Sequence, residues 1–115
     1  MQVLILTEGS ANIGLGHLGR CVALAQDFKK HKDVTGLKLV IKGDRRARDF
    51  LNANGTDFIK LDWINHLNKV LDMAQQANVC VIDSYLAPKS FYRRFYLNTF
   101  CRTAVIDDYN RLDYD

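Results

Sequence analysis

The sequence predicts an α/β fold, a Rossmann-like parallel sheet with helices on both faces. Five short apolar runs alternate with four segments in which apolar residues recur at helical spacing. The runs are almost wholly apolar, as expected of parallel strands buried on both faces. With 115 residues, 48% hydrophobic and 25% charged, the chain has the size and composition of one folded domain, and disorder is excluded as a description of the whole.

The first half of the chain contains three expected strands and two expected helices. Strands are expected over residues 3–7, 37–41 and 57–61, and helices over residues 16–31 and 45–54. Small residues fill the segment from Glu8 to Gly16, which is therefore expected to be a loop. Gly55 follows the second helix and suits its carboxyl-terminal cap.

The second half repeats the alternation. Leu67, Val70, Leu71 and Ala74 form the apolar stripe of a third helix, and a fourth strand over residues 79–82 ends at Asp83. A fourth helix is expected from residue 88, a proline, to residue 96, and a fifth strand over residues 103–106. The simplest strand order is 3-2-1-4-5, so the first and fourth strands flank the crevice in which such sheets bind ligands.

Charge and cysteine usage exclude several classes of protein. Sixteen basic and thirteen acidic residues give a net charge of +3 with both signs scattered, so no nucleic-acid partner is expected. The sequence lacks a membrane-spanning apolar run and a recognisable signal peptide. Cys21, Cys80 and Cys101 lack metal-site spacing and are expected to be buried thiols. A cytoplasmic location follows as an expectation.

A glycine-rich segment opens the first expected helix. Gly14, Gly16 and Gly19 match G-x-G-x-x-G, the fingerprint of dinucleotide-binding proteins. In that fingerprint the first glycine follows the strand closely, whereas six residues (8–13) intervene here, and Lys42 and Gly43 stand where an acidic residue is wanted. A stand-alone dinucleotide-binding module therefore remains the less favoured alternative.

His17 is the leading candidate for a catalytic residue. It lies in the first helical turn at the mouth of the crevice, where the helix dipole disfavours a positive charge and favours the neutral imidazole of a general base. Arg20, one turn further on, either clamps an anionic group or pairs with Asp83. Ser10 and Asn12 in the preceding loop are candidates for hydrogen bonds to a sugar, with turn formation as the alternative.

Carboxylates end the fourth and fifth strands. Asp83, with Tyr85 two residues later, is placed to bind sugar hydroxyls, to orient His17 or simply to cap the loop. Asp107 and Asp108 repeat the theme, but neighbouring residues of a strand point to opposite faces. With no further ligand at suitable spacing, no metal is expected.

Three segments together carry a resemblance to a known family. They are residues 14–25, which contain Gly-x-Gly-His-x-x-Arg-Cys, residues 82–85, Ile-Asp-Ser-Tyr, and residues 105–108, Val-Ile-Asp-Asp. In this order the chain resembles the amino-terminal half of the pseudaminic-acid nucleotide-sugar hydrolases. These enzymes release UDP from UDP-2,4-diacetamido-2,4,6-trideoxy-β-L-altropyranose, and the free sugar serves bacterial flagellin or surface-glycan modification. The family has two Rossmann-like domains in a GT-B arrangement.

The resemblance implies roles for matching positions. His17 would activate water for inverting attack on the anomeric carbon, Gly14 and Gly16 would let the loop close around the sugar, and Asp83 and Tyr85 would contact or orient the sugar. Asp107 and Asp108 match a family motif and would contact either the substrate or the other domain. No cofactor is implied.

The same resemblance bears on domain organisation. Residues 1–115 would form the water-activating domain, and the family's carboxyl-terminal domain, which holds the nucleotide, would be missing from this chain. Alone, the chain is then expected to bind UDP poorly and turn over little. A glycosyltransferase half, in which His17 deprotonates a sugar hydroxyl instead of water, remains the alternative function.

Overall fold

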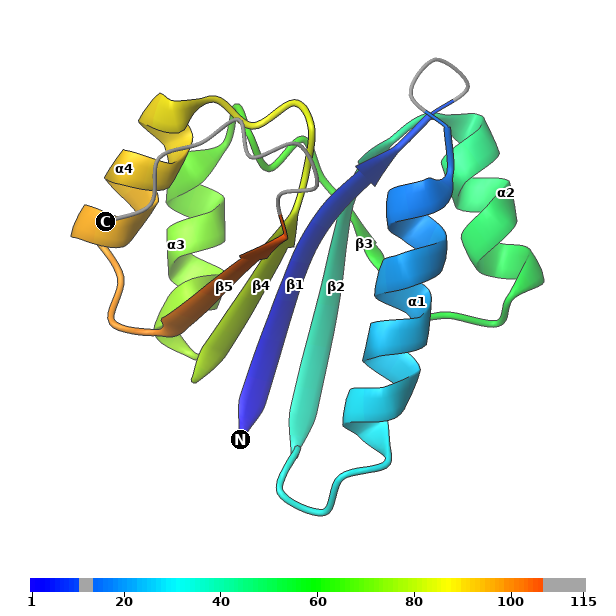
Figure 1. Ribbon diagram of the computed structural model, residues 1–115, viewed down its shortest axis with the longest axis horizontal. Coiled ribbons are helices and arrows are strands. Elements are labelled where there is room, and N and C mark those ends of the chain that lie inside the picture. Colours follow the sequence, from blue (N-terminus) through cyan, green and yellow to red (C-terminus); the bar gives the residue numbers. More distant parts are fainter. Residues whose placement is uncertain (11–13, 107–115) are drawn as a thin grey trace.

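The computed structural model describes residues 1–10 and 14–106, which form a five-stranded sheet with helices on both sides (Figure 1). All the strands are parallel, and their order is β3-β2-β1-β4-β5, which confirms the predicted order. The elements are β1 (Gln2–Gly9), α1 (Gly16–Lys29), β2 (Gly36–Gly43), α2 (Arg45–Ala53), β3 (Ile59–Lys60), α3 (Leu67–Gln75), β4 (Val79–Asp83), α4 (Lys89–Leu97) and β5 (Arg102–Ile106).

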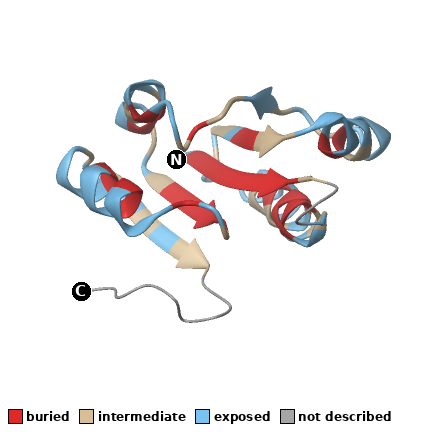
Figure 2. Ribbon diagram, turned by 90° about the horizontal axis from the view of Figure 1, so that it is seen from above, coloured by how far each residue is buried: buried red, intermediate tan, exposed pale blue. Residues whose placement is uncertain are grey.

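Alternating residues of the strands pack into two cores, one on each face of the sheet. Leu4, Leu6 and Ile82 pack with α3 and α4, whereas Val3 and Ile5 pack with α1 and α2. The alternation follows from the two-residue period of a strand. Seen from above, β1 is buried along nearly its whole length between the helical layers (Figure 2). This central position holds the carboxyl end of β1 rigidly beside that of β4.

Several expected boundaries change. The first strand continues to Gly9, so Glu8 belongs to β1 and not to the following loop. A Cβ on Gly9 would lie 2.4 Å from Leu18 Cδ1, so only glycine lets α1 pack this closely on the strand end. The third strand is reduced to Ile59–Lys60, both exposed, as suits a short edge strand. The fourth helix begins at Lys89, and Pro88 occupies the N-cap position just before it.

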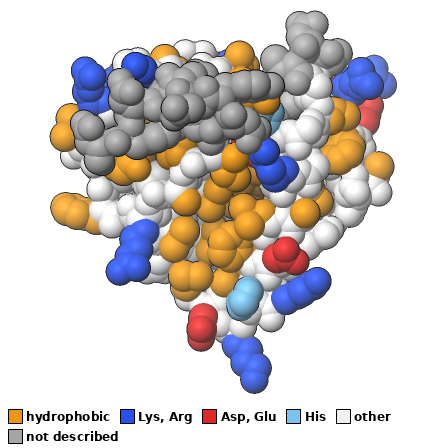
Figure 3. All heavy atoms as spheres, in the orientation of Figure 1, with side chains coloured by type: hydrophobic (Ala, Val, Ile, Leu, Met, Phe, Trp, Pro, Cys, Tyr) orange, Lys and Arg blue, Asp and Glu red, His pale blue; other side chains and the backbone are white. Residues whose placement is uncertain are grey.

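The two faces of the sheet are covered unequally. The aromatic residues Phe91, Tyr92 and Phe95 of α4 are buried against the sheet, whereas Tyr96 is exposed. On the opposite face Ala104 of β5 is exposed. Hydrophobic side chains gather in the middle of the surface in Figure 3, while Lys and Arg lie around it. Helices therefore flank both faces, but the described residues leave β5 partly open.

Within residues 1–10 and 14–106, none of the helices has the length and apolar character needed to cross a bilayer.

Candidate functional site

The candidate site lies where β1 and β4 end side by side and α1 begins. Thr7 of β1 pairs with Asp83 of β4 in the sheet register, and the Thr7 hydroxyl donates to the Asp83 carbonyl over 2.9 Å. The Trp63 indole N–H donates to the Thr7 carbonyl over 2.7 Å, and Trp63 is fully buried. These bonds fix the main chain on which Asp83 is carried. The carboxyl ends of β1 and β4, where the ligand crevice was predicted, therefore carry firmly held groups.

His17 and Asp83 form a buried pair. His17 Nδ1 lies 2.5 Å from Asp83 Oδ1, and the two residues are 4% and 0% exposed. Because an ionised carboxylate only accepts hydrogen bonds, Nδ1 carries the hydrogen and, in the neutral ring, Nε2 keeps its lone pair. Among the described residues, the buried Nε2 atom has no hydrogen-bond partner. The pair thus has the arrangement of an oriented general base.

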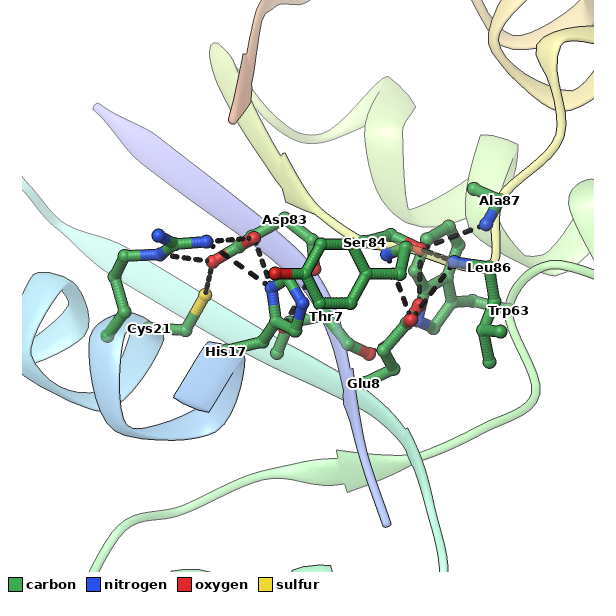
Figure 4. Close-up of polar contacts among 11 residues, drawn as sticks. Thr7, Glu8, His17, Cys21, Trp63, Asp83, Ser84, Leu86 and Ala87 are labelled. Atoms are coloured by element: carbon green, nitrogen blue, oxygen red, sulfur yellow. Dashed lines mark hydrogen bonds and ion pairs between the residues drawn. The ribbon is translucent and has the colours of Figure 1, made fainter. Parts of the chain in front are cut away.

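Asp83 also accepts hydrogen bonds from two further residues of α1 (Figure 4). Arg20 Nε donates to Oδ2 and Arg20 Nη2 donates to Oδ1, both over 2.7 Å, so the contact is bidentate. The Cys21 thiol lies 3.7 Å from Oδ2. Of the roles predicted for Arg20, pairing with Asp83 is the one observed; its side chain is still 39% exposed. The positive charge of the guanidinium offsets the free-energy cost of burying the carboxylate.

The Cys21 thiol is held in its neutral form. Burial raises the pKa of Cys21 to about 12, with the hydrogen bond from Thr7 opposing the change and the charge of Asp83 adding to it. Cys21 therefore contributes a weak, uncharged donor to Asp83. The sequence predicted its burial but gave no signal for the contact with Asp83.

A second buried carboxylate was missed by the sequence analysis. Glu8 is fully buried and accepts hydrogen bonds from the Ser84 hydroxyl and, over 3.0 Å each, from the main-chain N–H groups of Tyr85 and Leu86 (Figure 4). We call Glu8, Ser84, Tyr85 and Leu86 the Glu8 cluster. The sequence analysis placed Glu8 in the expected loop because it follows an apolar run. Its position at the carboxyl end of the first strand was the only signal that it belongs to the site.

Tyr85 links the Glu8 cluster to His17. Its ring packs edge-on against the imidazole, with ring centroids 4.0 Å apart and an interplanar angle of 81°. Tyr85 is half-buried, so its ring forms part of the cover over His17. The structure therefore brings Tyr85 to the histidine, whereas the contact with a sugar that the resemblance implies for Tyr85 stays a prediction.

Ser10 and Gly14 form an isolated antiparallel bridge at the start of the glycine-rich segment. Ser10 and Gly14 exchange main-chain hydrogen bonds of 3.2 and 2.8 Å, and Gly14 has φ of 82°, a value that favours glycine. A Cβ at Gly16 or Gly19 would meet no described atom within 4 Å. The space around these backbones agrees with a ligand approaching the loop. Asn12, Asp107 and Asp108 lie outside the described residues.

The structure shortens the distance along the chain between the first strand and Gly14, which the sequence analysis had taken as evidence against a dinucleotide site. Because β1 reaches Gly9, four residues (10–13) precede Gly14 instead of six. Moreover, β2 ends at Gly43 and Asp44 follows it directly. The Asp44 carboxylate accepts a hydrogen bond from Ala47 N and caps α2, so this acid is already engaged. Within residues 1–10 and 14–106, no cluster of three or more His, Cys, Asp or Glu side chains could hold a metal ion.

Comparisons with known proteins add one distant relative. No protein-family model and no solved structure matches the chain. The uncharacterized protein MJ1062 of Methanocaldococcus jannaschii is 25% identical over 108 residues, or 94% of this chain. The matched part is 22% of MJ1062, so the chain spans about a fifth of the length of this relative. The similarity supplies no activity, since the relative's name states none.

Proposed function

We propose that this chain is the water-activating part of an enzyme that hydrolyses a UDP-linked 2,4-diacetamido-2,4,6-trideoxy hexose. The observation that carries the proposal is the His17–Asp83 pair, in which Nδ1 is bound to a buried carboxylate and Nε2 is left without a described partner. The identity of the sugar and of UDP rests on the sequence resemblance alone. No metal or cofactor takes part in the proposed step.

The proposed reaction uses Nε2 as a general base. Nε2 accepts a proton from water while the water oxygen forms a bond to the anomeric carbon. The bond between that carbon and the UDP oxygen breaks, and UDP leaves with inversion at the sugar. Asp83 holds the imidazole in the required tautomer and stabilises the imidazolium that forms, as in other histidine–carboxylate pairs. Arg20 holds the Asp83 carboxylate in place through its two 2.7 Å contacts.

The remaining parts of the enzyme are also proposals. We place the nucleotide on a second domain, which follows the GT-B resemblance, and the sugar between that domain and the Gly14–Gly16 turn. Because the Nε2 atom is buried in this structure, the Tyr85 ring or the glycine-rich turn has to shift before water and sugar reach the base. The chain alone is then expected to release UDP slowly.

The test is UDP release from the UDP-sugar by the full-length gene product and its variants. His17→Ala is expected to lower the rate by at least about 10², the lower limit for loss of a general base. His17→Asn is a sharper variant, because its amide N–H replaces the Nδ1 donor to Asp83 without supplying a base. His31→Ala serves as the matched control, since His31 is an exposed histidine just beyond the carboxyl end of α1, whereas His17 lies in its first turn.

The outcomes separate the alternatives. Full activity in both His17 variants would refute the proposed base. Release that requires an added sugar acceptor would identify a glycosyltransferase, in which Nε2 deprotonates a hydroxyl of the acceptor. Saturable binding of a nicotinamide dinucleotide, with no UDP release, would instead favour the dinucleotide-binding module.

A further inference from the structure

The Glu8 carboxylate is committed to the segment that follows β4. Its Oε1 atom accepts from the Ser84 hydroxyl, and its Oε2 atom accepts from Tyr85 N and Leu86 N. Ser84 Oγ in turn accepts from Leu86 N and Ala87 N over 3.1 and 3.0 Å. One buried carboxylate and one hydroxyl thus bind the N–H groups of three consecutive residues. A carboxylate that accepts several main-chain N–H groups holds a turn more firmly than neutral acceptors do.

This arrangement fixes the main chain of Tyr85 relative to β1. The two strands are hydrogen-bonded in register up to Thr7 and Asp83, so Glu8, the next residue of β1, lies beside Ser84, which directly follows β4. Side chains alternate between the faces of a strand. Asp83 reaches α1 with its carboxylate, and Glu8 reaches the main chain of the loop, from adjacent strand ends.

The consequence reaches His17 through the Tyr85 ring. The ring lies edge-on to the imidazole at 4.0 Å, on a residue whose N–H is bound by Glu8. The imidazole is attached to Asp83 through Nδ1 only, so rotation of the ring plane about that contact is restrained by what packs against it. The Tyr85 ring supplies such a packing surface, and the hydrogen bond from Tyr85 N to Glu8 fixes the main chain that carries this ring.

From these contacts we infer that Glu8 is a positioning residue for His17, acting through the main chain of Tyr85. Glu8 holds the Tyr85 ring against the imidazole and thereby sets the direction in which Nε2 points. The kinetic part of this inference rests on the proposed function, whereas its structural part does not. A misplacement of about 1 Å in a reacting group lowers a rate by up to about 10².

The structural part is tested by NMR on the 115-residue chain. The aromatic ring of Tyr85 shifts the resonances of the His17 ring protons, and Tyr85→Leu removes that shift. Glu8→Gln, which has the same shape but puts an NH2 group among N–H donors, is expected to move the same resonances toward their positions in Tyr85→Leu. Asp72→Asn, an exposed carboxylate on α3, is the matched control and is expected to leave them unchanged.

Ser84→Ala provides a second variant if Glu8→Gln does not fold. It keeps the Glu8 carboxylate and its bonds to Tyr85 N and Leu86 N but removes the hydroxyl that both donates to Glu8 and accepts from the loop. A smaller shift in the same direction is expected. Unchanged His17 resonances in the folded Glu8→Gln or Ser84→Ala chain would overturn the inference.

The kinetic part is tested by a double-mutant cycle in the full-length gene product. Glu8→Gln is expected to lower kcat about 10-fold with KM little changed, and to have almost no further effect in a Tyr85→Leu background. Multiplicative losses in kcat would show that Glu8 acts independently of Tyr85, and an unchanged kcat would show that Glu8 serves stability alone, and either result would overturn the inference. Absence of UDP release from the wild-type enzyme would refute the proposed function instead, and the NMR result would still decide the role of Glu8.

Discussion

The two ends of strand β4 carry different kinds of buried polar pair. At the carboxyl end, Asp83 accepts hydrogen bonds from His17 and Arg20. At the amino end, the fully buried Cys80 thiol donates a hydrogen bond to the sulfur of Cys101, which is half-buried. The first end places a histidine and an arginine around a carboxylate, and the second pairs two thiols.

The thiol nearest each end shows what this difference does. Burial raises the pKa of Cys21, beside Asp83, to about 12. The hydrogen bond from Cys80 is the main cause that lowers the pKa of Cys101 to about 6, with further donation from the Thr99 hydroxyl at 3.4 Å. A buried thiol next to an acceptor stays protonated, whereas a partly exposed thiol next to donors ionises. The neighbours, rather than the strand, decide the chemistry at each end.

The strongest way to break the carboxyl end is Asp83→Asn. The amide offers an NH2 group where His17 and Arg20 require acceptors, so the imidazole loses its orientation and the guanidinium loses its counter-charge. If the proposed function holds, UDP release by the full-length gene product is expected to fall by at least about 10². We also expect the free energy of unfolding of the 115-residue chain to fall by about 3 kcal/mol, measured by urea denaturation.

Asp72→Asn is the control for this change, because Asp72 is exposed on α3 and its loss is expected to alter stability by less than about 0.5 kcal/mol. Equal stability of the Asp83→Asn and Asp72→Asn chains would contradict the view that Asp83 anchors the site.

Arg20→Lys is a milder test of the same end. Lysine keeps the positive charge but cannot make the two parallel contacts that arginine makes with Asp83. Since the Arg20 side chain is 39% exposed, water replaces part of the lost contact, and we expect a loss of only about 1 kcal/mol in urea denaturation. Arg48→Lys, at an exposed position of α2, is the matched control. Equal losses in the two variants would show that the bidentate geometry is unimportant.

The strand order and the main helices could be predicted because each is encoded locally. The run over residues 3–7 is apolar at every position but the last, and the Leu67–Val70–Ala74 stripe recurs at helical spacing. His17 and Asp83 were also predictable, since topology alone places the end of β4 beside the start of α1. Boundaries failed where pairing with another strand decided them, as at Gly9, which belongs to β1 because it pairs with Gly43 of β2.

The contacts of Glu8 and of Cys80 could not be read from the sequence. Glu8 binds a segment 76 to 78 residues away, and its partners there include main-chain N–H groups that every residue except proline possesses. Cys80 and Cys101 meet because the turn before β5 brings residue 101 back to β4, and no sequence period marks that turn. A contact between residues far apart in the sequence cannot be predicted from local patterns when one of the two residues lies in no recognisable motif.

The smallest expected effect on the fold concerns the amino end, and it sharpens the comparison between the two thiols. The lowered pKa means that the Cys101 thiolate is present above about pH 6 and is lost below it. Its alkylation by iodoacetamide, followed by mass spectrometry of the native chain, is therefore expected to reach half its maximal rate near pH 6, whereas Cys21 stays unlabelled. Cys80→Ala removes the main donor and is expected to move this midpoint toward the ordinary value near 9. Cys101→Ser is the labelling control, and it is expected to change the free energy of unfolding by less than about 0.5 kcal/mol. A Cys101 midpoint that is the same with and without the Cys80 thiol would show that the paired thiols do not set the chemistry of this end.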